Sequence, residues 1–219
     1  MSSRTARERP PRRLFARLTV AAGLVPAATA ALVLVLGSPL AEPLAEPRTG
    51  AAARSGPAST AAAALPAARP VRIGIPGLRV SAPLVDLTLD STGKLGVPDP
   101  AERNLAGWYR DGVTPGSPGN AIVVAHVDTP TGPAAFAGLD TLRPGATVEV
   151  RRADRRVAVF RVYAIEEYEK SDFPSTLVYG PTKDAQLRLL TCGGAYDRSA
   201  GGYQANVVAF ARLASVRAQ

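Results

Sequence analysis

The chain of 219 residues carries 26 basic and 18 acidic residues, and it contains a single cysteine and a single histidine. One cysteine excludes an intramolecular disulfide, and one cysteine with one histidine falls short of the three or four ligands of a usual zinc site. Six arginines against one glutamate lie within residues 1–17, so the rest of the chain has only a small positive excess. No basic stripe interleaved with aromatic residues accompanies this charge, and we therefore expect no nucleic-acid binding.

The N-terminal segments have the composition of a membrane anchor. Residues 1–17 form a basic tail, and residues 18–37 follow without a charged side chain, a length that spans the hydrocarbon core as a helix. The preceding arginines predict a cytoplasmic N-terminus and an external C-terminal body. A cleaved signal peptide is the alternative, because the Ala-rich stretch offers small-residue cleavage sites. We expect the uncleaved, single-pass anchor because of the length of the segment.

A linker is predicted next, over residues 38–69. This segment is rich in Ala and Pro, has no aromatic residue and shows no steady hydrophobic period. Such a composition is typical of a disordered or semi-extended spacer. We expect it to hold a domain off the membrane.

From residue 70 to residue 219 the sequence predicts one all-β domain. Short alternating apolar runs are separated by turn residues every 8–12 positions, which is typical of a β-barrel or sandwich. The predicted strands are 71–75, 81–87, 121–126, 147–151, 156–167, 186–191 and 206–213. Two short helical turns are predicted near 133–139 and 173–177.

The single histidine and the single cysteine each follow an apolar run, and we predict that both stand where a strand gives way to a loop. His126 follows residues 121–125, and Cys192 follows residues 187–191 and precedes two glycines. A cysteine nucleophile needs a basic partner, which a histidine supplies, and glycines let a backbone approach a substrate closely. A lone cysteine or a lone histidine is more often structural than catalytic. The pair is therefore a candidate site, and the distance between the two side chains in the folded chain decides whether it is catalytic.

The segments around these two residues resemble the sortase family. Residues 189–192 (Leu-Leu-Thr-Cys) resemble the signature Thr-Leu-x-Thr-Cys, with Arg188 in place of its leading threonine. The stretch 191–211 and the histidine strand 120–128 are similar to the actinobacterial class F branch. The resemblance covers about residues 70–214.

The resemblance implies an eight-stranded β-barrel with short helices and a cysteine transpeptidase activity. Such an enzyme cleaves a C-terminal sorting signal of the Leu-Pro-x-Thr-Gly kind between Thr and Gly. Cys192 is then expected to form a thioacyl enzyme, and His126 to protonate the leaving amine and deprotonate the incoming one. The expected partners are surface proteins with this signal and an amine of a cell-wall precursor or of another protein.

The third residue of the site stays open between two candidates. The family has an arginine near the start of the last strand, where this chain has Asn206. The first arginine after Cys192 is Arg198, which lies in the loop. Either side chain can donate to an oxyanion or a substrate backbone. We favour Arg198, because only it carries a charge.

Other acidic residues near the site are expected to be structural. Asp128 is able to orient the loop or a substrate, but we favour an Asx-turn into the following Thr-Pro. Glu166, Glu167 and Glu169 form an acidic run in one strand, where neighbouring side chains point to opposite faces. We therefore expect no calcium site, no other metal and no cofactor.

Two rival interpretations use the same residues differently. An L,D-transpeptidase is also an exported Cys/His enzyme, but it usually has a second histidine close to its cysteine, and this chain has only one. An anchored, non-catalytic β-domain that binds cell-wall or protein partners would use Cys192 as a core residue.

Overall fold

The computed structural model describes residues 62–219. The predicted tail (1–17), the predicted membrane span (18–37) and most of the predicted linker (38–69) lie outside these residues. Among the described residues, no helix has the length and apolar character needed to cross a membrane.

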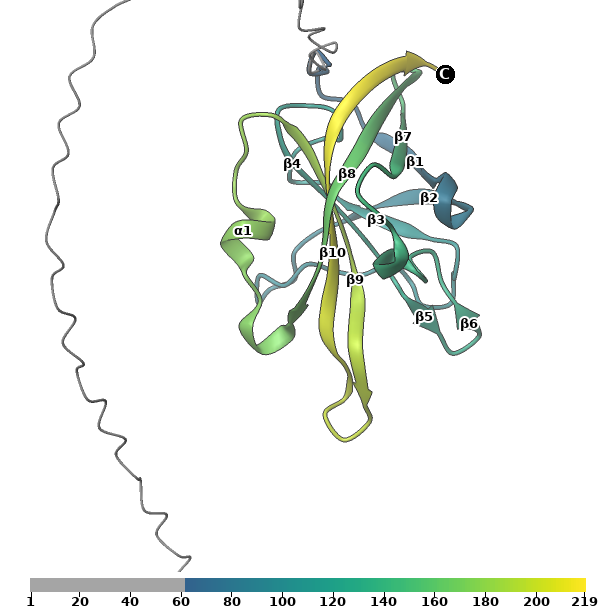
Figure 1. Ribbon diagram of the computed structural model, residues 1–219, viewed down its shortest axis with the longest axis vertical. Coiled ribbons are helices and arrows are strands. Elements are labelled where there is room, and N and C mark those ends of the chain that lie inside the picture. The colour runs from purple at the N-terminus through teal and green to yellow at the C-terminus, as the bar shows by residue number, and fades with distance from the viewer. Residues whose placement is uncertain (1–61) are drawn as a thin grey trace, which may run out of the picture. The chain divides into compact units, whose positions relative to one another are not determined.

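Eight strands of the described region close into a barrel in the order β1-β2-β3-β4-β9-β10-β8-β7 (Figure 1). The barrel strands are β1 (Pro70–Ile75), β2 (Val80–Leu87), β3 (Ala106–Tyr109), β4 (Gly119–Ala125), β7 (Thr147–Arg152), β8 (Arg156–Glu169), β9 (Ala185–Asp197) and β10 (Gly202–Ala218). A separate ribbon pairs β5 (Asp128–Thr129) with β6 (Gly132–Pro133). The short helices are η1 (Pro76–Leu78), η2 (Leu139–Thr141), η3 (Lys170–Asp172) and α1 (Ser175–Tyr179).

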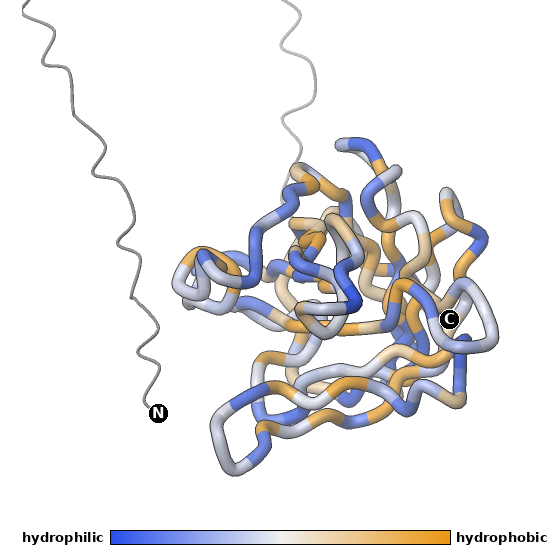
Figure 2. The backbone as a smooth tube through the Cα atoms, turned by 90° about the horizontal axis from the view of Figure 1, so that it is seen from below, coloured by the Kyte–Doolittle hydropathy of each residue, from blue (hydrophilic) through white to orange (hydrophobic). Residues whose placement is uncertain are grey.

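The interior of the barrel is filled by apolar side chains of its strands. Along the backbone, hydrophobic residues alternate with hydrophilic ones (Figure 2). Val123 of β4, Leu187 and Leu189 of β9, and Val148 of β7 are fully buried there. Burial of each such side chain stabilises the fold by about 1.5–3 kcal/mol. This core explains the period-2 pattern from which the strands were predicted.

A second apolar cluster covers the outer face of β4, β9 and β10. Ile122, Leu190, Val208 and Phe210 pack there, together with Val178 of α1. The connection between β8 and β9, which carries η3 and α1, thus buries a second face of the sheet. β4 is therefore apolar on both faces, which explains its near-continuous apolar run, whereas the outer face of β9 also carries Gln186 and Arg188.

β4 and β9 run parallel, in a barrel whose other pairs are antiparallel except β2 with β3. Their registered pairs extend from Gly119 with Ala185 to Val124 with Leu190. Because the strands are parallel, the segments that leave β4 and β9 in chain direction lie at the same end of the barrel. This topology brings the histidine segment and the cysteine segment together.

The structure confirms the predicted barrel and each predicted strand, and it adds the four-residue strand β3. β3 has the sequence Ala-Gly-Trp-Tyr, which is too short to show an alternating pattern. The helical turn predicted near 173–177 corresponds to α1, which starts after Pro174.

Two predicted features differ in detail. The helical turn predicted near 133–139 is confirmed as single turns, in which Ala137 and Leu139 donate to Ala134 and Phe136, and the regular helix η2 begins at Leu139. The N–H groups of residues 134 and 136 instead donate across the loop to residues 127 and 126. Cys192 is not at a strand end, because β9 continues to Asp197 by pairing with β10.

Candidate active site

The register of the barrel places Cys192 on the outer face of β9, opposite Asn206 of β10. Asn206 in turn pairs with Tyr168 of β8. Paired residues on adjacent strands share a face, and Leu190 and Val208, two residues away, lie on the outer apolar cluster. Cys192, Asn206 and Tyr168 therefore form a row across the outer face, which we call the outer row.

His126 is the first residue beyond β4. The last registered pair of the parallel strands is Val124 with Leu190, so the pairing stops two residues before His126 and Cys192. Adjacent strands lie about 4.8 Å apart, so the histidine segment leaves the barrel beside the part of β9 that leads to Cys192. Both residues are half-buried.

The imidazole of His126 is held by a backbone carbonyl. Its Nε2 lies 2.8 Å from the carbonyl oxygen of Pro98, a buried residue in the connection between β2 and β3. A carbonyl oxygen only accepts hydrogen bonds, so Nε2 must carry the proton and donate. In the neutral ring, Nδ1 is then the nitrogen that accepts a proton.

A β-bulge follows Cys192 directly. Ala205 pairs with Gly193 and Tyr203 pairs with Tyr196, so two residues of β9 oppose the single Gln204 of β10. Gly194 lies in the bulge with φ +72°, the left-handed region that favours glycine. Its N–H donates to Oε2 of Glu167 at 3.1 Å.

Asp128 lies two residues beyond His126 and makes a long-range contact. Its Oδ2 accepts a hydrogen bond from the Tyr203 hydroxyl at 2.6 Å. The predicted Asx-turn does not form among the described hydrogen bonds, in which Thr129 instead bonds within its own turn. The Asp128 carboxylate, through this hydrogen bond, raises the pKa of the Tyr203 phenol above its ordinary value of 10.0.

Residues 73–214 match the family model of the sortase domain. The chain belongs to the sortase family. A comparison with curated proteins gave no match. Sortase structures share the fold at low sequence identity. The sortase A of Listeria monocytogenes has a TM-score of 0.52 at 16% identity, and the alignment covers 70% of this chain and 92% of that one.

Two further sortases show the same likeness. The SrtA sortase of Actinomyces oris has a TM-score of 0.52 at 18% identity, with 70% of this chain and 84% of that chain covered. The sortase C of Streptococcus pneumoniae has a TM-score of 0.50 at 19% identity, with 66% of each chain covered. The barrel is therefore a sortase fold.

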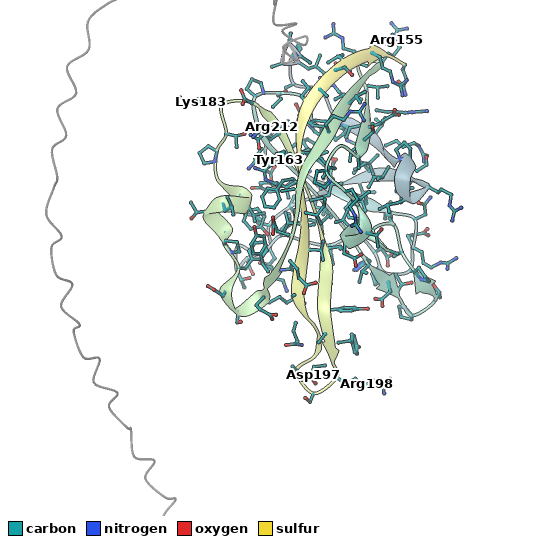
Figure 3. All side chains as sticks on the ribbon, in the orientation of Figure 1. Arg155, Tyr163, Lys183, Asp197, Arg198 and Arg212 are labelled. Atoms are coloured by element: carbon teal, nitrogen blue, oxygen red, sulfur yellow. The ribbon has the colours of Figure 1, made fainter. Side chains whose placement is uncertain are left out.

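The two candidates for the third residue of the site lie in very different places. Arg198 follows β9 in the turn of the β9–β10 hairpin, at the tip that Figure 3 labels with Asp197. Six residues of extended chain separate it from Cys192, which corresponds to roughly 20 Å. Asn206, by contrast, pairs directly with Cys192. The structure brings Asn206 to the thiol position and does not bring Arg198 there.

Arg188, which departs from the sortase signature, packs inside the domain. Its guanidinium lies 4.6 Å from the ring centroid of Phe210, and the residue is 3% exposed. Burial lowers the pKa of this arginine. Cation–π contact with Phe210 stabilises this arginine on the outer face of β9.

Three groups near the outer row were not predicted as parts of the site: the carbonyl of Pro98, the hydroxyl of Tyr203 and the carboxylate of Glu167. Each reaches its partner across a long stretch of chain. A backbone carbonyl carries no residue-type signal at all, and a tyrosine at a strand start is ordinary. Only the register of the folded barrel identifies them.

Proposed function

We propose that this sortase-family chain is a cysteine transpeptidase that cleaves a Leu-Pro-x-Thr-Gly-like sorting signal between Thr and Gly. The observation that supports the proposal is the parallel pairing of β4 with β9, which brings the segments of the single histidine and the single cysteine to the same end of the barrel. The proposed substrates are surface proteins that bear this signal, and the proposed acceptor is an amine of a cell-wall precursor or protein. The resemblance of residues 191–211 favours the class F branch.

The first half of the proposed reaction forms a thioacyl enzyme. The Cys192 thiol passes its proton to Nδ1 of His126, and Sγ attacks the carbonyl carbon of the substrate threonine. The tetrahedral intermediate collapses, the Thr–Gly C–N bond breaks, and the imidazolium returns the proton to the leaving amine. The donation from Nε2 to Pro98 supports this role, because it leaves Nδ1 as the nitrogen that takes and gives the proton.

The second half transfers the acyl group to the acceptor. The incoming amine attacks the thioester carbon, and His126 Nδ1 takes one of its protons. The C–S bond then breaks, and the proton returns to the sulfur, so that the thiol and the neutral imidazole are restored. One amide bond is broken and one is formed, and no external oxidant or metal is needed.

Asn206 is the proposed oxyanion donor. Its side-chain amide shares the outer row with Cys192, and an amide N–H is a suitable donor for the developing negative charge. Arg198 would give a stronger, charge-assisted bond, but it would have to reach back along the hairpin. The register therefore favours Asn206 over Arg198.

The proposed location is the external side of the cell membrane. The basic tail and the uncharged segment 18–37 support a single-pass anchor with a cytoplasmic N-terminus. The segment 38–69 would then hold the barrel at a distance from the membrane.

The test compares the full-length chain with Cys192→Ala and His126→Ala on a fluorogenic Leu-Pro-x-Thr-Gly peptide. We expect each variant to lose at least about 1,000-fold in kcat/KM, because the nucleophile and its proton partner act as a unit. Tyr196→Phe serves as the control, because Tyr196 is exposed and lies outside the outer row. Mass spectrometry of the trapped thioacyl adduct should locate it on Cys192.

Retained cleavage in either variant would exclude the mechanism. A folded wild-type chain that cleaves no such peptide, and whose cysteine resists a peptide-based thiol reagent, would instead support the non-catalytic binding domain.

A further inference from the structure

We infer that Asp128 and Tyr203 form a clasp that positions His126 against Cys192; this inference rests on the proposed function. The two residues are 75 positions apart in the chain and are joined by a hydrogen bond of 2.6 Å. Asp128 belongs to the histidine segment, and Tyr203 belongs to the strand that pairs with the cysteine strand. We call the pair the clasp and assign it a positioning role.

The histidine segment needs such a tie because it has already left the barrel. β4 ends at Ala125, and the following loop is hydrogen-bonded mainly to itself, through Ala134 to Val127 and Phe136 to His126. Within residues 62–219, the clasp is the hydrogen bond that joins this loop to the β9–β10 hairpin. Without it, no strand pairing fixes the distance between the imidazole and the thiol.

Tyr203 is a suitable anchor because its position follows that of the cysteine strand. It pairs with Tyr196 of β9, and the two rings meet edge to face with centroids 5.0 Å apart. The β-bulge that contains Gly194 separates this pair from Cys192. The hydroxyl of Tyr203 therefore moves with the segment that follows the nucleophile.

The chemistry of the pair keeps the clasp closed at neutral pH. Hydrogen bonding to Asp128 raises the pKa of the Tyr203 phenol, so the phenol stays protonated and donates. A phenol O–H on a carboxylate is a charge-assisted hydrogen bond, which is stronger than a neutral one. The phenol has no other hydrogen-bond partner among the described residues.

His126 is thus held from two sides. Pro98 fixes the far nitrogen of the ring, and the clasp fixes the backbone two residues downstream. Proton transfer requires the thiol and Nδ1 to approach within hydrogen-bond distance. A misplacement of about 1 Å reduces the rate roughly 100-fold. Neither clasp residue needs to touch the bonds that change.

The decisive experiment compares Tyr203→Phe with Tyr196→Phe in the full-length chain. Each substitution removes one hydroxyl from one ring of the same aromatic pair, but only Tyr203 bonds to Asp128. We expect Tyr203→Phe to lower kcat by roughly 10- to 100-fold with KM within about twofold, and Tyr196→Phe to leave both unchanged. Melting temperatures of both variants should match the wild type.

The role of the Asp128 carboxylate is tested by two substitutions, one that removes the hydrogen-bond acceptor and one that keeps it. Asp128→Ala should behave like Tyr203→Phe, and the double variant should be no worse than either single one, because both remove the same bond. Asp128→Asn should retain most activity, since its amide oxygen still accepts from the phenol. Additive losses in the double variant would overturn the clasp.

Two measurements that do not depend on sorting activity are possible because His126 and Cys192 are each unique in the chain. The chain has one histidine and one cysteine, so the imidazole NMR signals report His126 alone and iodoacetamide alkylation reports Cys192 alone. Tyr203→Phe should shift and broaden the His126 signals and change the pH profile of alkylation, whereas Tyr196→Phe should not. Identical signals and profiles in the two variants would refute the clasp, even if the wild type cleaves the peptide. If the wild type cleaves no peptide, the proposed function fails, and these two measurements still decide whether the clasp exists.

Discussion

At the scale of single residues, the site depends on which side chain faces the thiol. His126 and Cys192 were predicted because each occurs once, and uniqueness is visible in a sequence. The choice between Arg198 and Asn206 was not predictable from the sequence, because both residues follow Cys192 within a short stretch of chain. Charge favoured Arg198, but the pairing of β9 with β10 sets Asn206 opposite Cys192. Register is a property of the folded hairpin, so the sequence alone was not able to rank them.

The donor assignment predicts a clear order among three variants. Asn206→Ala should lower kcat by roughly 100-fold, the usual effect of removing one oxyanion donor, while Arg198→Ala should stay within about twofold. Asn206→Arg should retain more activity than Asn206→Ala, because a guanidinium donates from the same position. Single-turnover acylation of the peptide gives the relevant rate. A larger loss in Arg198→Ala would identify Arg198 as the donor.

At the scale of elements, the strands were predicted well and their ends poorly. Alternating apolar residues mark the barrel interior, but the Gly-Gly-Ala-Tyr segment after Cys192 has no apolar pattern and looks like a loop. β9 nevertheless continues through it, because β10 supplies a partner and Gly194 absorbs the extra residue as a bulge. In the segment 133–139 only single turns form before η2, because the N–H groups of residues 134 and 136 bond across the loop to residues 127 and 126.

The bulge is testable with two glycines that share a positive φ. Gly194 has φ +72° and an added Cβ would lie 2.7 Å from the Ala205 Cβ, whereas Gly201 has φ +84° and open space around it. Both alanine variants carry the left-handed strain of about 1–2 kcal/mol. Only Gly194→Ala must also shift β10 beside Asn206.

We therefore expect Gly201→Ala to keep full kcat. In Gly194→Ala, kcat should fall roughly 10-fold or more, because the shift of β10 displaces the groups of the site. Urea unfolding should show a larger loss of stability for Gly194→Ala. Equal kcat values in the two variants would show that the bulge does not set the position of the site.

At the scale of the whole molecule, one buried arginine holds the segment before β1 against the barrel. Arg152 of β7 is 1% exposed, and its guanidinium donates to the carbonyls of Pro66 and Pro115 and to the carboxylate of Asp154. Leu65 is buried beside it, and its N–H donates to Gly116 at 2.8 Å. Residues 65 and 66, just before β1, therefore pack against the barrel.

Removing this arginine should destabilise the domain while leaving the chemistry intact. Arg152→Ala leaves the carbonyls of Pro115 and Pro66 without this donor, and an unsatisfied buried polar group costs about 1–3 kcal/mol. Arg151, next in the chain, is exposed, so Arg151→Ala is the matched control and should change stability by less than about 0.5 kcal/mol. Urea unfolding followed by the fluorescence of the single tryptophan, Trp108, measures both. Below the unfolding transition, kcat of Arg152→Ala should equal that of the wild type, because the arginine contacts none of the residues of the outer row. Equal stabilities of the two alanine variants would show that the segment before β1 is not held in this way.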